Sequence, residues 1–153
     1  MALSDYIETE LILLDLQSAN RDEVIEELVD TLVSQRKEIN RQQILKAVIE
    51  REQLGSTGIG EGIALPHGKF SFVERPTLVF GRSLPGIRFE AIDSHPVHLV
   101  FLVLGSTKKE HQQIYLDLMK DTARLLKQEV LRKALLSADK PSRVKELIQK
   151  YEG

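Results

Sequence analysis

The hydrophobic pattern in the first third of the chain predicts two amphipathic helices. Asn20 with Glu23 three residues later is typical of a capping box, and apolar residues then recur every three or four positions. This helical face contains Val24, Ile25, Leu28, Val29, Leu32 and Val33. Asn40 and Gln43 begin a second helix in the same way, and Gly55 stands where its C-terminal cap is expected. Its apolar face contains Ile44, Leu45, Val48 and Ile49.

The middle of the chain has the pattern of β-strands. The run IALPHG is strand-like and is expected to stop at Pro66 and His67. Residues 77–84 (TLVFGRSL) are a second candidate. Residues 97–105 (VHLVFLVLG) are so uniformly apolar that they predict a strand buried on both faces, in the middle of a sheet. Residues 10–16 add one further candidate strand.

Helices are predicted again in the last third. Thr107 and Glu110 form another capping box, which opens a long helix through about Lys127. Two shorter helices follow, in the runs VLRKALLSA and SRVKELIQKYE. Because helices come first, then strands, then helices again, the order predicts an α/β fold: a mixed central β-sheet flanked by helices on both faces.

Composition excludes several classes of protein. The chain has 153 residues, of which 42% are hydrophobic and 29% charged, and no linker or repeat divides it, so residues 1–153 are expected to form a single domain. The net charge of -2 gives no reason to expect binding of nucleic acid. Without cysteine there are no disulfides and no thiolate metal sites. Because neither a signal peptide nor a run of transmembrane length is present, a cytoplasmic location without membrane insertion is expected.

Residues 55–62 (GSTGIGEG) are half glycine and predict a loop that leads toward His67. Glycine allows a ligand to approach the main chain closely, and consecutive free N–H groups can bind an anion. Ser56 and Thr57 add hydroxyl donors, and together with Gly58 they are the candidate phosphate-binding residues of this loop.

Neither of the two common nucleotide-binding motifs fits this loop. Gly58, Gly60 and Gly62 stand at alternate positions between a predicted helix and a strand, whereas the dinucleotide fingerprint needs G-x-G-x-x-G between a strand and a helix. A P-loop needs four residues between its glycines, but five separate Gly62 from Gly68. No nucleotide cofactor is therefore expected.

Histidines are the candidate reactive groups. Imidazole is a competent nucleophile at neutral pH, and Arg51 and Lys69 are positive groups available to a phosphoryl group on His67. Without its surroundings, His67 would better fit an ordinary surface or capping histidine with no chemistry. His95 and His98 would point to opposite faces of a strand, and no cysteine or acidic residue completes a ligand set, so no metal site is predicted.

The run GSTGIGEGIALPHGK resembles the active-site signature of enzyme IIA domains in the bacterial phosphoenolpyruvate-dependent phosphotransferase system, fructose–mannitol–nitrogen class. Downstream, FGRSLPGIRFEAIDSHPVHLVFLVLG resembles the family's central sheet region, and KEHQQIYLDLMKDTARLL resembles its following helix. The resemblance covers essentially the whole chain in order. It implies a mixed sheet sandwiched by helices, which agrees with the predicted order of elements.

The resemblance also implies a site. A small phosphocarrier (HPr or its nitrogen-branch counterpart NPr) would pass a phosphoryl group to Nε2 of His67, the phosphorylated nucleophile, without a metal or organic cofactor. Arg51 would stabilise that group from the end of the second helix, and His111 would lie close and support His67 by hydrogen bonding. The spacing of His111 also fits a satisfied, partly buried histidine in the apolar stripe of its helix. An exposed apolar patch would dock the partner, with Ile59, Ile63 and Phe70 as candidates.

Three functions stay open at this point. A nitrogen-type protein regulates other proteins according to its phosphorylation state, and the end of the chain at Gly153 without a fused transporter favours it. A sugar-type (fructose or mannitol) domain would instead pass the phosphoryl group to an enzyme IIB. A third possibility, from another class, is a binding module in which His67 is never phosphorylated.

Overall fold

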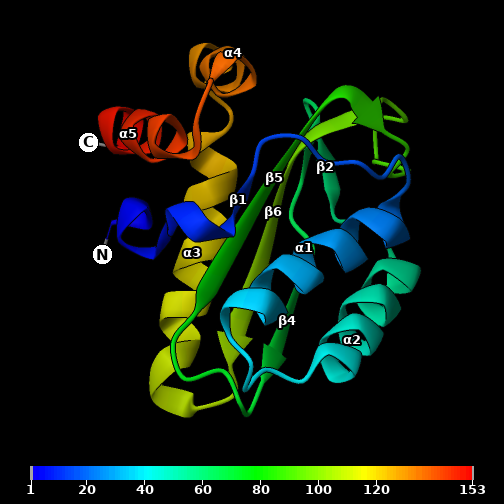
Figure 1. Cartoon of the computed structure of the whole chain (residues 1–153), viewed down its shortest axis with the longest axis vertical. Helices are drawn as coiled ribbons and strands as arrows, with labels where there is room; N and C mark the ends of the chain where they lie inside the picture. The colour runs from blue at the N-terminus through cyan, green and yellow to red at the C-terminus, as the bar shows by residue number, and fades with distance from the viewer. Residues whose placement is uncertain (1, 153) are drawn as a thin grey trace.

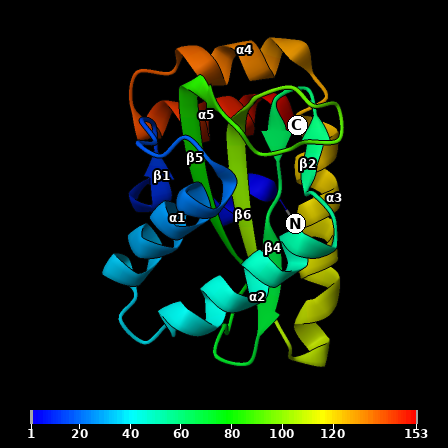
Figure 2. The same ribbon diagram turned by 90° about the vertical axis from the view of Figure 1, so that its right-hand side faces the viewer.

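A six-stranded mixed β-sheet lies between two layers of helices in the computed structural model, which describes residues 2–152 (Figures 1 and 2). The strands are β1 (Ile12–Leu13), β2 (Gly58–Gly60), β3 (Ile63–Ala64), β4 (His67–Phe70), β5 (Thr77–Ile87) and β6 (Val97–Ser106). The α-helices are α1 (Arg21–Gln35), α2 (Arg41–Leu54), α3 (Gln112–Leu125), α4 (Glu129–Ser137) and α5 (Pro141–Glu152). Single 3₁₀ turns are η1 (Leu3–Tyr6), η2 (Thr9–Leu11) and η3 (Lys109–His111). This architecture confirms the predicted fold class.

Strand β6 is the centre of the sheet. The strand order is β1-β5-β6-β3-β2, and β4 also pairs with β6. On one edge β6 runs antiparallel to β5, and on the other it pairs in parallel first with β3 and then with β4, where His67 lies opposite Val103. All of β6 except His98 is buried. The prediction of a central strand covered on both faces is therefore confirmed.

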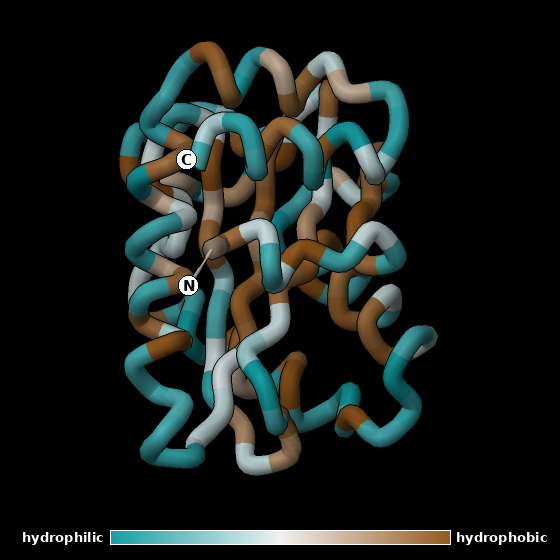
Figure 3. The backbone as a smooth tube through the Cα atoms, turned by 90° about the vertical axis from the view of Figure 1, so that its left-hand side faces the viewer, coloured by the Kyte–Doolittle hydropathy of each residue, from teal (hydrophilic) through white to brown (hydrophobic). Residues whose placement is uncertain are grey.

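Alternate residues of β6 contribute to two separate hydrophobic cores. Val100, Leu102 and Leu104 pack with the layer formed by α1 and α2, whereas Phe101 and Val103 pack with the layer formed by α3, α4 and α5. Figure 1 shows these two helical layers on opposite sides of the sheet. In Figure 3, which faces the second layer, the helices alternate hydrophobic and hydrophilic stretches, as expected for helices that bury one face.

The ends of the first two helices agree with the sequence signals. The side chain of Asn20 accepts a hydrogen bond of 3.0 Å from the backbone N–H of Glu23, and Asn40 accepts one of 3.0 Å from Gln43. Gly55 is the C-cap of α2, as predicted. The side chains of Asn20 and Asn40 thus satisfy backbone N–H donors that the first turn of a helix leaves free.

The predicted start of the long helix at Thr107 is wrong. Helix α3 begins only at Gln112, and its N-cap is His111, whose side chain makes no capping hydrogen bond. The preceding residues form the 3₁₀ turn η3 instead. At the end of β6, the hydroxyl of Ser106 accepts the N–H of Lys108 at 3.0 Å, and this contact turns the chain before any α-helical bond can form.

The glycine-rich stretch is a β-hairpin rather than an open loop. Strands β2 and β3 pair antiparallel, and the two residues between Gly60 and Ile63 both have positive φ, 58° at Glu61 and 76° at Gly62. Two consecutive positive φ values are typical of a tight hairpin turn, which explains the need for glycine at this point.

The strand-like run around His67 also differs from its prediction. It does not stop at Pro66 and His67: β3 ends at Ala64, and a new strand, β4, begins at His67. Pro66 separates the two because it has no N–H to donate to the ladder, although its carbonyl accepts the N–H of Val103 at 2.9 Å. No helix within residues 2–152 is long and apolar enough to span a membrane.

Candidate functional site

The pairing of β4 with β6 aims the side chain of His67 toward α3. His67 lies opposite Val103, which belongs to the core on the α3 side, and paired residues project from the same face of a sheet. The next residue, Gly68, projects toward α2: a Cβ there would lie 3.6 Å from Cγ2 of Val48 and 2.9 Å from Cζ of Phe70. A glycine at this position therefore lets β4 approach α2 closely while His67 faces the other layer.

The imidazole of His67 is held by the backbone of the segment that precedes its strand. Its Nδ1 lies 2.9 Å from the carbonyl oxygen of Leu65, and because a carbonyl can only accept, Nδ1 carries the hydrogen. The lone pair of the neutral ring is then on Nε2. Among residues 2–152, Nε2 has no hydrogen-bond partner, and the side chain is half-buried. This arrangement leaves a free nucleophilic nitrogen at the surface.

Tyr115 of α3 is the aromatic neighbour of His67. The two ring centroids are 6.4 Å apart, with the ring planes inclined by 59°. Burial raises the pKa of Tyr115 to about 12, and the positive charge of Arg51 opposes part of that rise. Tyr115 therefore lies beside His67, on β4, and within the electrostatic influence of Arg51, on α2. The sequence placed Tyr115 only in the apolar stripe of its helix, because no local signal distinguishes a core tyrosine from one beside a reactive histidine.

Arg51 lies in the last turn of α2, at the edge of the site. Its Nη1 donates to the carbonyl of Gly55 at 2.8 Å, so the guanidinium caps a free carbonyl at the C-terminus of the helix. A guanidinium carries five N–H donors, and this contact uses one of them. The remaining donors are available to an anion near Tyr115.

His111 is one helical turn before Tyr115 and on the same side of α3. Its Nδ1 is buried and has no hydrogen-bond partner in the part of the chain that the structure describes. No hydrogen bond joins its ring to His67 within residues 2–152. The hydrogen bond expected between the two histidines therefore stays a prediction for a phosphorylated protein.

The donors of the hairpin are largely engaged within the protein. The N–H of Thr57 donates to Oε2 of Glu52 at 3.1 Å, and its hydroxyl donates to Oε1 of the same carboxylate. The N–H of Gly58 donates to the hydroxyl oxygen of Ser56 at 3.0 Å. Thus the expectation of consecutive free N–H groups is not met at Thr57 and Gly58. Of these three residues, Ser56 alone keeps a hydroxyl proton free to donate.

Glu52 was missed by the sequence interpretation. It is only 2% exposed, and both of its oxygens accept from Thr57. One signal was present: an acidic residue in the last turn of a helix opposes the helix dipole, so it needs a specific partner to be stable there.

Two of the three residues predicted to form an exposed docking patch are buried. Ile63 is 2% exposed and Phe70 3%, since Ile63 packs in the core on the α3 side of the sheet and Phe70 in the core on the α1–α2 side; that prediction was wrong. Ile59, on β2, is 40% exposed, as expected. The structure adds Leu54, 87% exposed in the last turn of α2, and Leu116, 57% exposed beside Tyr115.

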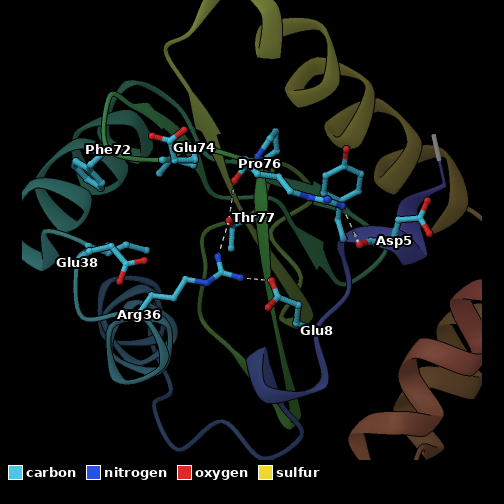
Figure 4. A pocket seen from close by; sticks show the side chains of 12 residues that line it. Asp5, Glu8, Arg36, Glu38, Phe72, Glu74, Pro76 and Thr77 are labelled. Carbon is cyan, nitrogen blue, oxygen red and sulfur yellow. Dashed lines mark hydrogen bonds and ion pairs between the residues drawn. The ribbon is translucent and has the colours of Figure 1, made fainter.

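The two remaining histidines have local contacts. Nδ1 of His98 lies 2.9 Å from the carbonyl of Ser83, and His95 is exposed in the segment before β6. A pocket of about 470 Å³ opens elsewhere, between η1, the end of α1 and the β4–β5 connection (Figure 4). Its arginines are engaged, Arg36 with Glu8 and Thr77, and Arg75 over a tyrosine ring. None of the site residues named above lines it.

Comparison with known proteins identifies the family. Residues 5–151 match the family described as "Phosphoenolpyruvate-dependent sugar phosphotransferase system, EIIA 2". The chain is 34% identical over 152 residues to the fructose-specific EIIABC component of Bacillus subtilis (strain 168), a match that covers 99% of this chain and 24% of that protein. The chain thus spans about a quarter of the length of this relative.

Two further similarities cover most of this chain and most of the related protein. The fructose-specific EIIA component of Haloferax volcanii is 36% identical over 141 residues, which is 91% of this chain and 89% of that protein. The crystal structure of nitrogen regulatory protein IIA-Ntr from Neisseria meningitidis superposes with a TM-score of 0.85 at 25% identity, over 95% of this chain and 98% of that one. The chain belongs to the EIIA 2 family of the phosphoenolpyruvate-dependent sugar phosphotransferase system.

Proposed function

We propose that this protein carries a phosphoryl group on Nε2 of His67, received from a small phosphocarrier of the HPr or NPr kind. The observation that carries the proposal is the hydrogen bond from Nδ1 of His67 to the carbonyl of Leu65. It fixes the tautomer that leaves Nε2 as the nucleophile, on a half-buried side chain. A fixed ring orientation also favours attack in line with the bond that breaks.

The transfer is balanced without a cofactor. The lone pair of Nε2 attacks the phosphorus of the carrier's phosphohistidine, a new N–P bond forms, and the old N–P bond breaks with its electron pair returning to the carrier's ring. The hydrogen of His67 stays on Nδ1, hydrogen-bonded to the carbonyl of Leu65, throughout. The carrier's ring loses the positive charge of its phosphorylated form and the ring of His67 gains that charge, so no net proton transfer is needed.

Arg51 and His111 would bind the transferred group. Arg51 has donors beyond the one it gives to Gly55, and its charge acts on Tyr115, next to His67. His111 has a buried Nδ1 without a partner within the described residues, on the side of α3 that carries Tyr115. Positioning and electrostatic stabilisation supply most of the catalysis in phosphoryl transfer. Ser56 is a third candidate donor, whereas Thr57 and Gly58 would shape the hairpin beside the site.

Leu54, Ile59 and Leu116 would form the docking surface for the carrier. Leu54 follows Arg51 within one helical turn, and Leu116 follows Tyr115 directly. Isolated exposed apolar residues are common, but large apolar side chains around a reactive group suit an interface.

For the destination of the phosphoryl group, we propose nitrogen-type regulation first, in line with the superposition on IIA-Ntr over nearly the whole chain. A sugar-type role, with transfer to an enzyme IIB, is the second candidate. The identities of 34% and 36% to fructose-specific components, one of them named EIIABC, favour it.

The test of the phosphoryl-carrier role is intact-mass analysis after incubation with phosphoenolpyruvate, enzyme I and HPr or NPr. An acid-labile gain of one phosphoryl group is expected in the wild type and in His95→Ala, which removes an exposed histidine. His67→Ala should show no gain. If the wild type gains nothing from an active carrier, the proposal is wrong and the binding-module function is favoured.

A second incubation separates the two destinations. Phosphorylated protein is mixed with a purified fructose-type enzyme IIB, and the phosphoryl group is followed on both proteins. Transfer to the IIB within seconds would support the sugar-type role. Retention of the group over minutes would support the regulatory role.

A further inference from the structure

The ring of Tyr115 occupies space that any side chain larger than glycine at position 105 would fill. A Cβ atom on Gly105 of β6 would lie 2.4 Å from Cδ1 and 2.6 Å from Cγ of Tyr115, so the ring packs directly against the backbone of the central strand. The side chain is 5% exposed. The ring is also the neighbour of the His67 ring, with centroids 6.4 Å apart. The phenol is therefore fixed in place before any phosphoryl group arrives.

The hydroxyl of Tyr115 is free although the ring is buried. This hydroxyl forms no hydrogen bond with any of residues 2–152. If its oxygen were buried, it would be a buried polar atom without a partner, but within that range only Nδ1 of His111 is in that state. The Tyr115 oxygen must consequently keep contact with solvent. A buried tyrosine usually directs its hydroxyl to a protein partner, whereas this hydroxyl, on a ring beside His67, is left to water or to a ligand.

The charges around Tyr115 favour an anion. The guanidinium of Arg51 acts on the phenol from α2, and His111 lies one turn away on the same helix face. Because burial raises the pKa of Tyr115 to about 12, its hydroxyl keeps its proton at neutral pH and acts only as a neutral donor toward an anion.

We propose that the hydroxyl of Tyr115 donates a hydrogen bond to an oxygen of the phosphoryl group on His67, and so belongs to the phosphoryl-binding site. The inference rests on the proposed phosphorylation of His67 and adds a residue to it. No covalent bond forms or breaks at Tyr115, and its proton stays on the phenol oxygen. Tyr115 thus contributes a neutral hydrogen-bond donor to the site, whereas Arg51 contributes a charged one.

The hydrogen bond should prolong the life of the phosphohistidine. The phosphoryl group leaves through a loose, metaphosphate-like transition state, in which its outer oxygens hold less negative charge than in the bound dianion. A donor to those oxygens stabilises the bound dianion more than the transition state. Removing the hydroxyl should therefore speed hydrolysis about three- to tenfold, the usual range for one hydrogen bond to a charged group that water partly replaces.

The test uses potassium phosphoramidate, a chemical donor that phosphorylates histidine without any protein partner. Wild type, Tyr115→Phe and Tyr151→Phe are loaded, and peptide mapping against His67→Ala assigns the product to His67. Tyr115→Phe keeps the ring on Gly105 and removes only the hydroxyl. Tyr151 lies on α5, and its substitution is the matched control. The half-life of phospho-His67 is measured for each, and the Cζ carbon signal of Tyr115 is followed by NMR before and after loading.

The expected result is a half-life three- to tenfold shorter in Tyr115→Phe, no change in Tyr151→Phe, and a shift of the Tyr115 Cζ signal on loading. Equal half-lives with an unmoved Cζ signal would overturn the inference. Loading by phosphoramidate without any transfer from the carrier would refute the proposed function alone, and the half-lives would still decide the role of Tyr115. A His67 that phosphoramidate cannot load would overturn both.

Discussion

The carboxylate of Glu52 accepts both the backbone N–H and the hydroxyl of Thr57, five residues later in the chain. Both residues are buried, at 2% and 4% exposure, so neither can exchange its partner for water. The pair joins the last turn of α2, which carries Arg51, to the start of the hairpin that leads to His67.

Thr57→Val is expected to destabilise the protein, because it leaves one oxygen of a buried carboxylate without its donor. Unfolding by urea should show a loss of about 1–3 kcal/mol, the usual penalty for an unsatisfied buried polar group. Thr57→Ser keeps the hydroxyl and is the control, with a smaller loss. If Val and Ser variants were equally stable, the hydroxyl would contribute nothing at this position.

Gly105→Ala should be poorly tolerated. The added Cβ would meet the ring of Tyr115 at 2.4 Å, which forces the ring or the central strand to move. Overpacking of this kind costs about 1–3 kcal/mol, measurable as a lower denaturation midpoint. Gly55→Ala is the matched control, because no atom lies within 4 Å of its added Cβ. A Gly105→Ala protein as stable as Gly55→Ala would contradict the tight contact with Tyr115.

Tyr115 should make stability depend on alkaline pH. Its pKa is raised to about 12 in the folded protein, above the value of 10.0 that is usual for tyrosine, so the folded state binds its proton more tightly than the unfolded state. The contribution is fully present below pH 10.0 and is lost as the pH rises from there to about 12. The stability difference between wild type and Tyr115→Phe should therefore change across that range, when urea unfolding is compared at successive pH values. A difference that stays constant up to pH 12 would contradict the buried phenol.

Arg82 should be important for stability and not for phosphorylation. It is 6% exposed on β5 and donates to the carbonyls of Leu14, Leu135 and Ala138, at 3.0, 3.1 and 2.6 Å, which ties β5 to the end of α4. Arg82→Met leaves these carbonyls without a charged donor and should cost about 2–4 kcal/mol in thermal or urea unfolding.

The matched control for Arg82 is Arg124→Met. The side chain of Arg124 is 73% exposed and, among residues 2–152, forms an ion pair with Asp121 alone, three residues earlier, so its loss should be small. Folded Arg82→Met protein should still accept a phosphoryl group on His67. A loss of phosphorylation in protein that circular dichroism finds fully folded would contradict a purely structural role for Arg82.

Leu54 and Leu116 allow docking to be separated from chemistry. The double variant Leu54→Ser, Leu116→Ser should take up the phosphoryl group from the carrier about tenfold more slowly, since exposed apolar anchors of an interface are lost. Its loading by phosphoramidate should be unchanged, because that small donor needs no protein interface. Val130→Ser, 64% exposed on α4, is the control. Equal slowing with both donors would place the defect in the site itself.

Much of the fold followed from local patterns. The caps at Asn20 and Asn40 and the fully apolar strand before Gly105 were predicted correctly, because each depends on side chains within a few residues. The capping box at Thr107 failed because the chain forms the 3₁₀ turn η3 there, with the hydroxyl of Ser106 accepting the N–H of Lys108. The open loop at residues 55–62 failed because glycines that permit anion binding also permit a tight hairpin.

The candidate site was predicted only in part. The spacing around His67 drew attention to it, and its resemblance to a family signature named Arg51 and His111. No pattern in the sequence indicated that Ile63 and Phe70 would be buried, since short apolar runs are the same on an exposed edge and inside a sheet. Nor did any pattern reveal the buried pair of Glu52 with Thr57.

The sequence by itself determined where the first two helices begin, which strand lies at the centre of the sheet, and which histidine follows the glycine-rich stretch. These features depend on contacts within one or two turns of the chain. The tertiary structure alone decided that Tyr115 lies beside both His67 and Gly105, that the charge of Arg51 acts on the same phenol, and that Arg82 is buried. Such relationships join residues tens of positions apart, and they exist only once the strand pairing has fixed which side of β4 faces α3.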